Sequence, residues 1–377
     1  MDRTTNLGYL LLACILFASC GFNQRDHQIV ISNPTDEERQ ELVAIRHAEW
    51  LASFGRDTMV RIVDVASGNE IPYQLETQGM AETQQVLLAV TVPASGSITL
   101  AVEQSAPAPV AARAYARYVP ERYDDFAWEN DVVAFRMYGK ALEGRPDDAQ
   151  GLDIWSKRTT DLVVDKWYAQ GDYHTDHGEG MDYYSVGMTL GAGDIAPFAD
   201  DTVVFSKHYR HYEIVDNGPL RTSFKLTYEP WQVGTKTVSV TKQFTLDAGS
   251  QLNRVDVTYS IDGEEKLPVA IGVARRKQPG ELLQEEKEGI FGYWEPEIGH
   301  HGITGVGVVL EKGGFSGFGE LSNQFLAFAE ATKDTSLTYY VGGAWSKAGK
   351  YTSAEAWFAY LRAFKERIAS PLIVKIN

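Results

Sequence analysis

The sequence predicts an all-β protein, an antiparallel β-sandwich of large sheets with a few short helices and one C-terminal helix. Short runs in which every second residue is apolar recur along the chain, and sequences rich in Gly, Pro, Asn and Asp separate them. This pattern is typical of strands that bury one face and are joined by turns. Helical spacing of apolar residues is clear in one stretch only, near the C-terminus.

The first strands are expected between residue 28 and about residue 102. Four apolar runs occur there, at 29–31, 60–63, 86–92 and 98–100, with turn sequences between them. Residues 104–116 (QSAPAPVAARAYA) are rich in Ala and Pro. We therefore expect a soft internal boundary near 104–116.

The strongest strand pattern lies between about residue 202 and residue 261. Three runs alternate there, over 224–228, 238–246 and 255–261, and turns at 216–219 and 247–250 separate them. The C-terminal helix is expected to begin at a capping box from Thr352 to Glu355, because Trp357 and Leu361 continue it at helical spacing. A last strand is expected over 371–376.

The N-terminus resembles an export signal. Arg3 precedes the apolar run Leu7–Ala18, which is shorter than the about 20 residues that span a membrane. Ala18 and Ser19 before Cys20 resemble a bacterial lipobox, so we expect a signal peptide over 1–19, lipidation at Cys20 and a tether over 20–27. The alternatives are a plain secretory signal and an anchor helix. Residues 28–377 are expected to form a single β-sandwich catalytic domain, exported and attached to a membrane only through lipid.

Composition excludes several functions. The 377 residues include 35 Lys and Arg against 51 Asp and Glu, a formal charge of −16, and nucleic acid is therefore a poor partner. Cysteine occurs only at Cys14 and Cys20, within the predicted signal. The remaining chain can form no internal disulfide, thiolate nucleophile or Cys-ligated zinc site.

Histidines, carboxylates and aromatic residues gather in one polar region, residues 121–212. His174, Asp176, His177 and Glu179 lie within six residues of one another, and three interpretations remain open. They can transfer protons, with Tyr183 as a second carrier, or bind a divalent metal such as Zn or Mn, or serve structure alone. The spacing matches no standard metal motif.

Seven segments resemble a family of uncharacterised domains that is common in polysaccharide-utilisation loci. They are WENDVVAFRMYG (128–139), DIWSKRT (153–159), DKWY (165–168), DYHTDHGEGMDYYSVG (172–187), NGPLRTSFKLTY (217–228), LDAGSQLNR (246–254) and YYVGGAW (339–345). The resemblance implies a galactose-mutarotase-like β-supersandwich. One characterised branch of the family is an ulvan oligosaccharide dehydratase, which implies removal of water from a terminal uronic acid.

Such an elimination requires a base, a group that stabilises the carboxylate and an acid for the leaving oxygen. We expect His174 or His177 with Tyr183 to carry protons. We expect Arg158 and Arg136 to hold the carboxylate, because a guanidinium fork matches its geometry. The expected substrate contacts are Trp128, Asn130, Trp155, Lys157, Glu179, Tyr184 and His208.

Other functions remain open. A lyase would use the same residues, since only the leaving group differs, and a hydrolase would need two acidic residues from among Asp172, Asp176, Glu179 and Asp182. A lipoprotein that binds oligosaccharide without catalysis would use the tryptophans and leave the histidines structural. His208 and His211 are expected on opposite faces of one strand, so at most one of them faces a given cleft.

Overall fold

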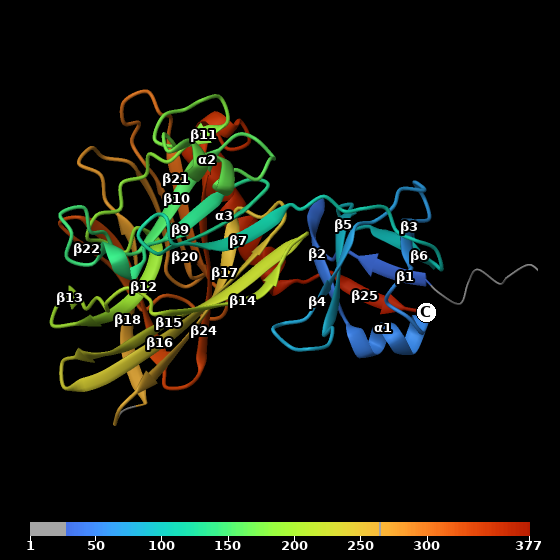
Figure 1. Cartoon of the computed structure of the whole chain (residues 1–377), viewed down its shortest axis with the longest axis horizontal. Coiled ribbons are helices and arrows are strands. Elements are labelled where there is room, and N and C mark those ends of the chain that lie inside the picture. The colour runs from blue at the N-terminus through green and yellow to red at the C-terminus, as the bar shows by residue number, and fades with distance from the viewer. Residues whose placement is uncertain (1–27, 264) are drawn as a thin grey trace, which may run out of the picture.

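The computed structural model describes residues 28–263 and 265–377. The strands form a small lobe near the N-terminal end of the described chain and a large lobe that holds most of the chain (Figure 1). The described residues form five sheets, and their paired strands run antiparallel. The prediction of an all-β, antiparallel fold with few helices is confirmed.

The small lobe packs two sheets against each other. Across the first sheet the order is β25 (Ile373–Ile376), β1 (Gln28–Ser32), β6 (Ser97–Glu103) and β3 (Arg61–Asp64). Across the second it is β2 (Arg39–Arg46), β5 (Gln85–Val92) and β4 (Tyr73–Glu76). Helix α1 (His47–Phe54) adds Trp50 to the apolar core between the sheets. Since β25 is the last strand, the C-terminus lies in this lobe.

The large lobe is built around an eight-stranded sheet. Its order is β14 (His211–Asn217), β15 (Arg221–Val233), β16 (Lys236–Asp247), β17 (Leu252–Ile261), β24 (Ser336–Trp345), β21 (Thr304–Leu310), β20 (Ile290–Trp294) and β19 (Glu281–Glu285). The alternating runs that the sequence marks become β15, β16 and β17. In β16 half-exposed and buried residues alternate from Thr237 to Asp247, as a sheet with one covered face requires.

Two five-stranded sheets complete the large lobe. One has the order β11 (Gly180–Met181), β10 (Leu152–Lys157), β9 (Ala134–Met137), β8 (Asp125–Asn130) and β7 (Ala114–Val119). The other has the order β13 (Thr202–Val203), β12 (Ala192–Ala199), β18 (Lys266–Ala274), β23 (Gln324–Thr332) and β22 (Gly317–Leu321). Short helical turns η1 (Lys140–Leu142) and η2 (Ser346–Ala348) lie in the connections.

The C-terminal helix α3 (Ala354–Ala369) covers part of the large sheet. Trp357 and Leu361 pack there in one apolar cluster with residues of β20 and β21. The predicted capping box is displaced by one residue: Ser353, not Thr352, caps the helix, and its hydroxyl accepts from the N–H of Ala356. Serine in this position satisfies an N–H that the first turn leaves unpaired.

Helix α2 (Val164–Gln170) determines what the sheet of β8, β9 and β10 can expose. One face of that sheet packs into the main core, which includes Trp128 and Ile154. The other face packs under α2, where Trp155 stacks on Trp167 with ring centroids 5.6 Å apart. Every residue of β8, β9 and β10 is therefore buried. Side chains on these strands meet protein on both faces.

The sequence predicts one β-sandwich domain over 28–377, and the structure divides this range into two lobes with separate apolar cores. The segment between β6 and β7, residues 104–113, connects them. Within the described residues, no helix combines the length and the apolar character needed to cross a membrane.

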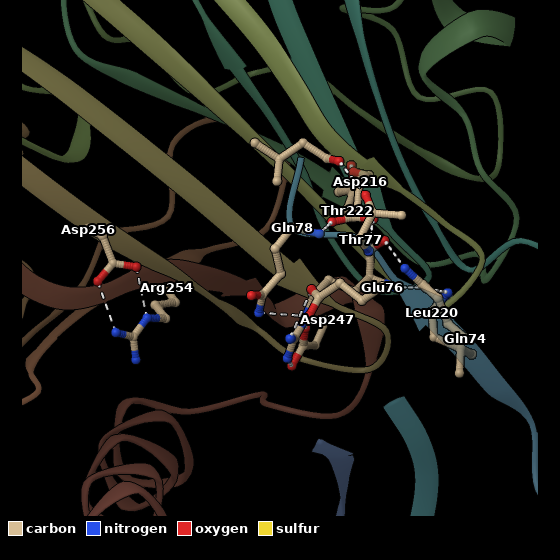
Figure 2. Close-up of polar contacts among 12 residues, drawn as sticks. Gln74, Glu76, Thr77, Gln78, Asp216, Leu220, Thr222, Asp247, Arg254 and Asp256 are labelled. Atoms are coloured by element: carbon tan, nitrogen blue, oxygen red, sulfur yellow. Dashed lines mark hydrogen bonds and ion pairs between the residues drawn. The ribbon is translucent and has the colours of Figure 1, made fainter. Parts of the chain in front are cut away.

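Polar contacts join the lobes along β4 and the strands β14 and β15 (Figure 2). Arg221 binds Asp247 of its own lobe at 2.5 Å and Glu76 of the small lobe at 3.2 Å. The backbone N–H groups of Thr77 and Gln78 donate to the Asp216 carboxylate, at 2.8 and 2.7 Å. Because Glu76 is 4% exposed, its charge depends on Arg221 for compensation.

Candidate active site

One end of the large lobe brings together strand ends from two sheets. Strands β10, β11 and β21 are labelled close together in the upper part of Figure 1. A hollow of about 340 Å³, part of it open to solvent, lies here. Its lining includes Ser156 of β10, Thr304 of β21 and Trp345 of β24. Several polar side chains meet at its edge.

Tyr183 is the centre of this group. Its hydroxyl lies 2.7 Å from the Thr304 hydroxyl and also hydrogen-bonds Ser156. Its ring centroid lies 5.5 Å from that of His301 and 6.4 Å from that of Trp345. Burial raises the pKa of Tyr183 to about 12, so the hydroxyl is protonated at neutral pH. It can therefore donate a proton or a hydrogen bond.

Arg158 lies directly after β10 and shares the neighbour Trp345 with Tyr183. Its guanidinium carbon is 5.1 Å from the ring centroid of Trp345. Nε donates to the Gly178 carbonyl at 3.0 Å and Nη2 donates to Asp176 at 2.5 Å. Among the described residues Nη1 has no hydrogen-bond partner, and 30% of the side chain is exposed. A fixed, partly exposed guanidinium suits an anionic ligand.

His301 is a member of the group that sequence reasoning did not select. It lies in the loop before β21, is exposed, and tilts its ring 33° against Tyr183. The Trp345 indole N–H donates to the His301 carbonyl at 2.7 Å, which fixes this loop against β24. Trp345 ends the YYVGGAW segment, and this segment is the one feature of the sequence that points to the region around His301.

A buried ion pair lies near Tyr183. Glu295 follows β20 and binds Arg276 at 2.7 Å, with 3% of the Glu295 side chain and 10% of the Arg276 side chain exposed. Burial raises the pKa of Glu295 to about 7 against the opposing effect of Arg276. Burial is the main cause of the raised pKa of Tyr183, and the negative charge of Glu295 raises that pKa further. Sequence reasoning did not select this pair.

His174 and His177 lie on a neighbouring loop and are both exposed, by 63% and 53% of their side chains. His174 Nδ1 is 2.8 Å from the Asp182 carbonyl and His177 Nε2 is 3.2 Å from the Asp172 carbonyl. A carbonyl only accepts, so each of these nitrogens is the donor in its hydrogen bond. No contact joins either histidine to Tyr183 in the part of the chain that the structure describes.

Arg136 does not face a cleft, which corrects the prediction that it holds a substrate carboxylate. It is 3% exposed, and it binds Asp153 and, at 2.9 Å, Asp182. Burial, together with the neighbouring Asp182 carboxylate, raises the pKa of Asp153 to about 7. The alternation of Arg136 with the core residues is as expected, but α2 and its loop cover the outer face.

Trp128 and Asn130 are also structural, contrary to prediction. Trp128 is 0% exposed, and its indole donates to Asn253 at 2.7 Å inside the main core. The Asn130 amide donates to the carbonyls of Asp247 and Ser250, at 2.6 and 2.7 Å, and so holds the turn between β16 and β17. Neither residue can reach a ligand.

Trp155 and Lys157 line the hollow, but both side chains are buried and packed or paired within the protein. Trp155 is 0% exposed under α2, and Lys157 Nζ donates to Glu129 at 2.7 Å. Glu129 also accepts from the N–H groups of Val163 and Val164, at 2.8 and 2.7 Å. The buried pair therefore anchors the start of α2, as an acid at a helix N-terminus does.

The remaining predicted contacts are separated from one another. Glu179 pairs with Lys166 at 2.6 Å and does not orient a histidine. Tyr184 is 5% exposed, and Arg276 lies 4.4 Å above its ring. His208 is 3% exposed, lies before β14 rather than in it, and binds Asp148 at 2.9 Å. The prediction that His208 shares a strand with His211 is therefore wrong.

No three His, Cys, Asp or Glu side chains of the described residues form a group that could hold a metal ion. The predicted signal peptide, Cys20 and the tether lie outside the described residues. Of the predicted site residues, Arg158 and Tyr183 both contact Trp345, and Tyr183 also contacts His301 and Thr304. These five residues are called the Tyr183 cluster below.

The fold and this cluster define a β-sandwich protein with a group of polar side chains beside a hollow at one end of the large lobe. The chain belongs to the family described as domain of unknown function DUF4861, whose model matches residues 31–374. A relative named Uncharacterized protein P7, from Formosa agariphila, is 30% identical over 393 aligned residues and is matched along 98% of both chains. The resemblance to an uncharacterised-domain family is confirmed.

Two solved structures share the fold. An α-mannosidase from Enterococcus faecalis V583 has a TM-score of 0.52 and 9% identity, and covers 93% of this chain and 46% of its own. A protein in glycosyl hydrolase family 38 from Enterococcus faecalis has a TM-score of 0.52 and 10% identity, with coverages of 94% and 48%. This chain spans just under half the length of each. At these identities the likeness concerns the fold.

Proposed function

We propose that the protein is a carbohydrate-active enzyme that eliminates water from a terminal uronic acid of an oligosaccharide, of the ulvan type, and leaves an unsaturated uronate. One observation carries the proposal: the protonated Tyr183 contacts the exposed His301 and the Trp345 indole, and the partly free guanidinium of Arg158 lies over the same indole. These are the three kinds of group that a β-elimination requires.

Each residue has a role that follows from its surroundings. Arg158 binds the uronate carboxylate through Nη1 and stabilises the negative charge that develops when the C5 proton leaves. His301 accepts the C5 proton, because it is the exposed histidine in contact with Tyr183. Tyr183 donates its proton to the departing C4 oxygen, which leaves as water, and regains a proton from solvent.

The acidic residues near the cluster favour elimination over hydrolysis. Burial pushes the pKa of Asp176 up, but the Gly178 N–H and Arg158 outweigh it and lower that pKa. The hydrogen bond from Lys166 lowers the pKa of Glu179. A hydrolase acid needs a raised pKa and access to substrate. Asp182 has a raised pKa because it is buried, yet it is 1% exposed and bound to Arg136.

The proposal is tested by incubating the protein with a panel of uronate-terminated oligosaccharides, with and without chelator, and recording ultraviolet absorbance and mass. Loss of one water with a new conjugated chromophore is the expected result. Shorter fragments with the chromophore would show a lyase, and new reducing ends without it would show a hydrolase. Unchanged mass on every glycan that binds would show a binding protein.

We also propose that the protein is exported and lipidated at Cys20, which the lipobox-like sequence before Cys20 supports. The test is the mass of the mature protein from a bacterial membrane fraction, compared with that of Cys20→Ser. A diacylglycerol-sized increase in the native chain only is expected, and equal masses for the two chains would contradict lipidation.

A further inference from the structure

A second hollow lies away from the Tyr183 cluster, where β7, η1 and β14 meet. It holds about 410 Å³ of space, part of which is open solvent. Six residues line it: Tyr118, Asp124, Lys140, Tyr209, Arg210 and Tyr212. None of them lines the hollow beside Tyr183.

The hollow has an aromatic wall. Tyr212 stacks on Tyr118 with ring centroids 4.8 Å apart and an interplanar angle of 17°, and 44% of Tyr212 stays exposed. The stack and the neighbouring Phe126, 5.5 Å away, fix the ring. A rigid, half-exposed tyrosine offers a flat apolar surface at little cost in side-chain entropy.

Asp124 is held in the hollow by a turn that costs conformational energy. Tyr123 and Asp124 have φ angles of 53° and 64°, the left-handed region that non-glycine residues rarely adopt. The Tyr209 hydroxyl donates to the Asp124 carbonyl at 2.5 Å, and the Tyr118 hydroxyl donates to Asp124 Oδ1. A side chain on Gly139 would lie 1.8 Å from the same carbonyl, so this contact requires glycine.

The charges of the hollow are balanced. Asp124 Oδ2 has no hydrogen-bond donor among the described residues, and Lys140 has no ion-pair partner there. Arg210 is compensated by Glu143 at 2.7 Å and Glu229 at 3.3 Å. The free groups are therefore one acceptor and one cation beside an aromatic ring, a set that matches vicinal hydroxyls on an uncharged ring better than an anion.

We propose that this hollow is a second sugar-binding site, which takes an uncharged pyranose unit against Tyr212 with its hydroxyl groups between Asp124 and Lys140. The inference rests on the proposed function in one respect, since it takes carbohydrate as the ligand. It assigns the hollow to holding a glycan and no part of the reaction to its residues.

The test is saturation-transfer NMR with the methyl pyranosides of glucose, galactose, mannose and xylose, each at about 10 mM, enough to fill a site with a Kd of about 1 mM. Methyl glucuronide serves as the charged comparison. The native protein should give transfer to the ring protons of at least one neutral glycoside, and more than to the glucuronide. Tyr212→Ala should weaken that binding about tenfold.

Two variants serve as controls. Ile214→Ala removes an apolar side chain of 40% exposure from the same face of β14, and should leave transfer unchanged. Tyr183→Phe should also leave it unchanged, while uronate turnover falls. Transfer that survives Tyr212→Ala, or that Ile214→Ala removes equally, would overturn the proposal, as would no transfer from any neutral glycoside. Transfer without uronate turnover in the native protein would contradict the proposed enzyme and leave this site standing.

Discussion

The guanidinium of Arg158 lies over the indole ring of Trp345, with 5.1 Å between the guanidinium carbon and the ring centroid. The two residues stand at the ends of strands in different sheets, β10 and β24. Their contact holds the guanidinium against the ring, with 30% of the Arg158 side chain exposed. The packing of two sheets thus creates a contact that neither strand carries alone, and in the proposed function it positions Arg158 for a carboxylate.

Replacing Arg158 with lysine should raise KM for a uronate-terminated substrate by about 10-fold to 100-fold. Lysine keeps the charge but loses the planar fork that binds a carboxylate and stacks on Trp345. The matched control is Arg362→Lys, because Arg362 of α3 forms a partly exposed ion pair with Glu285 of β19. Initial rates over a range of substrate concentrations decide the matter. Equal KM values for the native protein and Arg158→Lys would remove Arg158 from the site.

The histidines are separated by parallel substitutions. His301→Asn should lower kcat about 100-fold or more, since the base is lost. His174→Asn and His177→Asn should change kcat less than about threefold, because neither ring contacts Tyr183. All three side chains are exposed, and equal melting temperatures are expected. A large loss in His174→Asn or His177→Asn with native rates in His301→Asn would restore the assignment that the sequence favours.

Titration of Glu295 should make the stability of the native protein depend on pH. This dependence should be absent in Glu295→Gln. The pKa of Glu295 is raised to about 7 by burial, so the unfolded chain loses this proton at lower pH than the folded protein does. Its contribution to stability is complete below the unfolded pKa and declines as pH rises from about 4.5 to about 7. Relative to Glu295→Gln, the native protein should lose on the order of 3 kcal/mol over that interval.

The measurement is urea unfolding at a series of pH values for the native protein, Glu295→Gln and Glu179→Gln. Glu179 is the matched control because its pKa is lowered by Lys166, so its effect has the opposite sign: stability is lost as pH falls. A native-minus-Glu295→Gln difference that stays constant between pH 4.5 and pH 7 would contradict the raised pKa.

The stability of the contact between the two lobes should depend on Arg221. In Arg221→Met the Glu76 carboxylate, 4% exposed, loses its cation, which should cost about 3 to 5 kcal/mol of unfolding free energy. Arg254→Met is the control, because Arg254 pairs with Asp256 where both side chains are partly exposed, and about 1 kcal/mol or less is expected (Figure 2). Limited proteolysis should cleave the segment 104–113 faster in Arg221→Met only. Equal costs and equal cleavage would contradict this role.

Much of the fold could be predicted, because it depends on local patterns. Alternation along β16 and the helical spacing of Trp357 and Leu361 come directly from which faces are buried. The sequence indicates the division into two lobes only as a soft boundary, because the division depends on how the sheets pack. The short helix α2 lacks a side-chain cap hydrogen bond, which removes the usual signal for its start.

The candidate site was harder to predict for a physical reason. Arg136, Trp155 and Lys157 alternate as residues of a sheet with one open face would, but α2 covers that face. The polar residues on these strands therefore form buried ion pairs, although their pattern in the sequence is also typical of strands that line a cleft. His301 was missed because its contact with Tyr183 joins distant segments, and no local pattern encodes such a contact.

The most direct test of the account is a single comparison of the native protein with Tyr183→Phe on a uronate-terminated oligosaccharide, followed by absorbance and mass. Phenylalanine keeps the ring between His301 and Trp345 and removes only the hydroxyl. We expect loss of one water and a new chromophore with the native protein, and a rate about 100-fold to 10,000-fold lower with the variant at an unchanged melting temperature. Native rates in Tyr183→Phe, or products without the chromophore, would contradict elimination at the Tyr183 cluster.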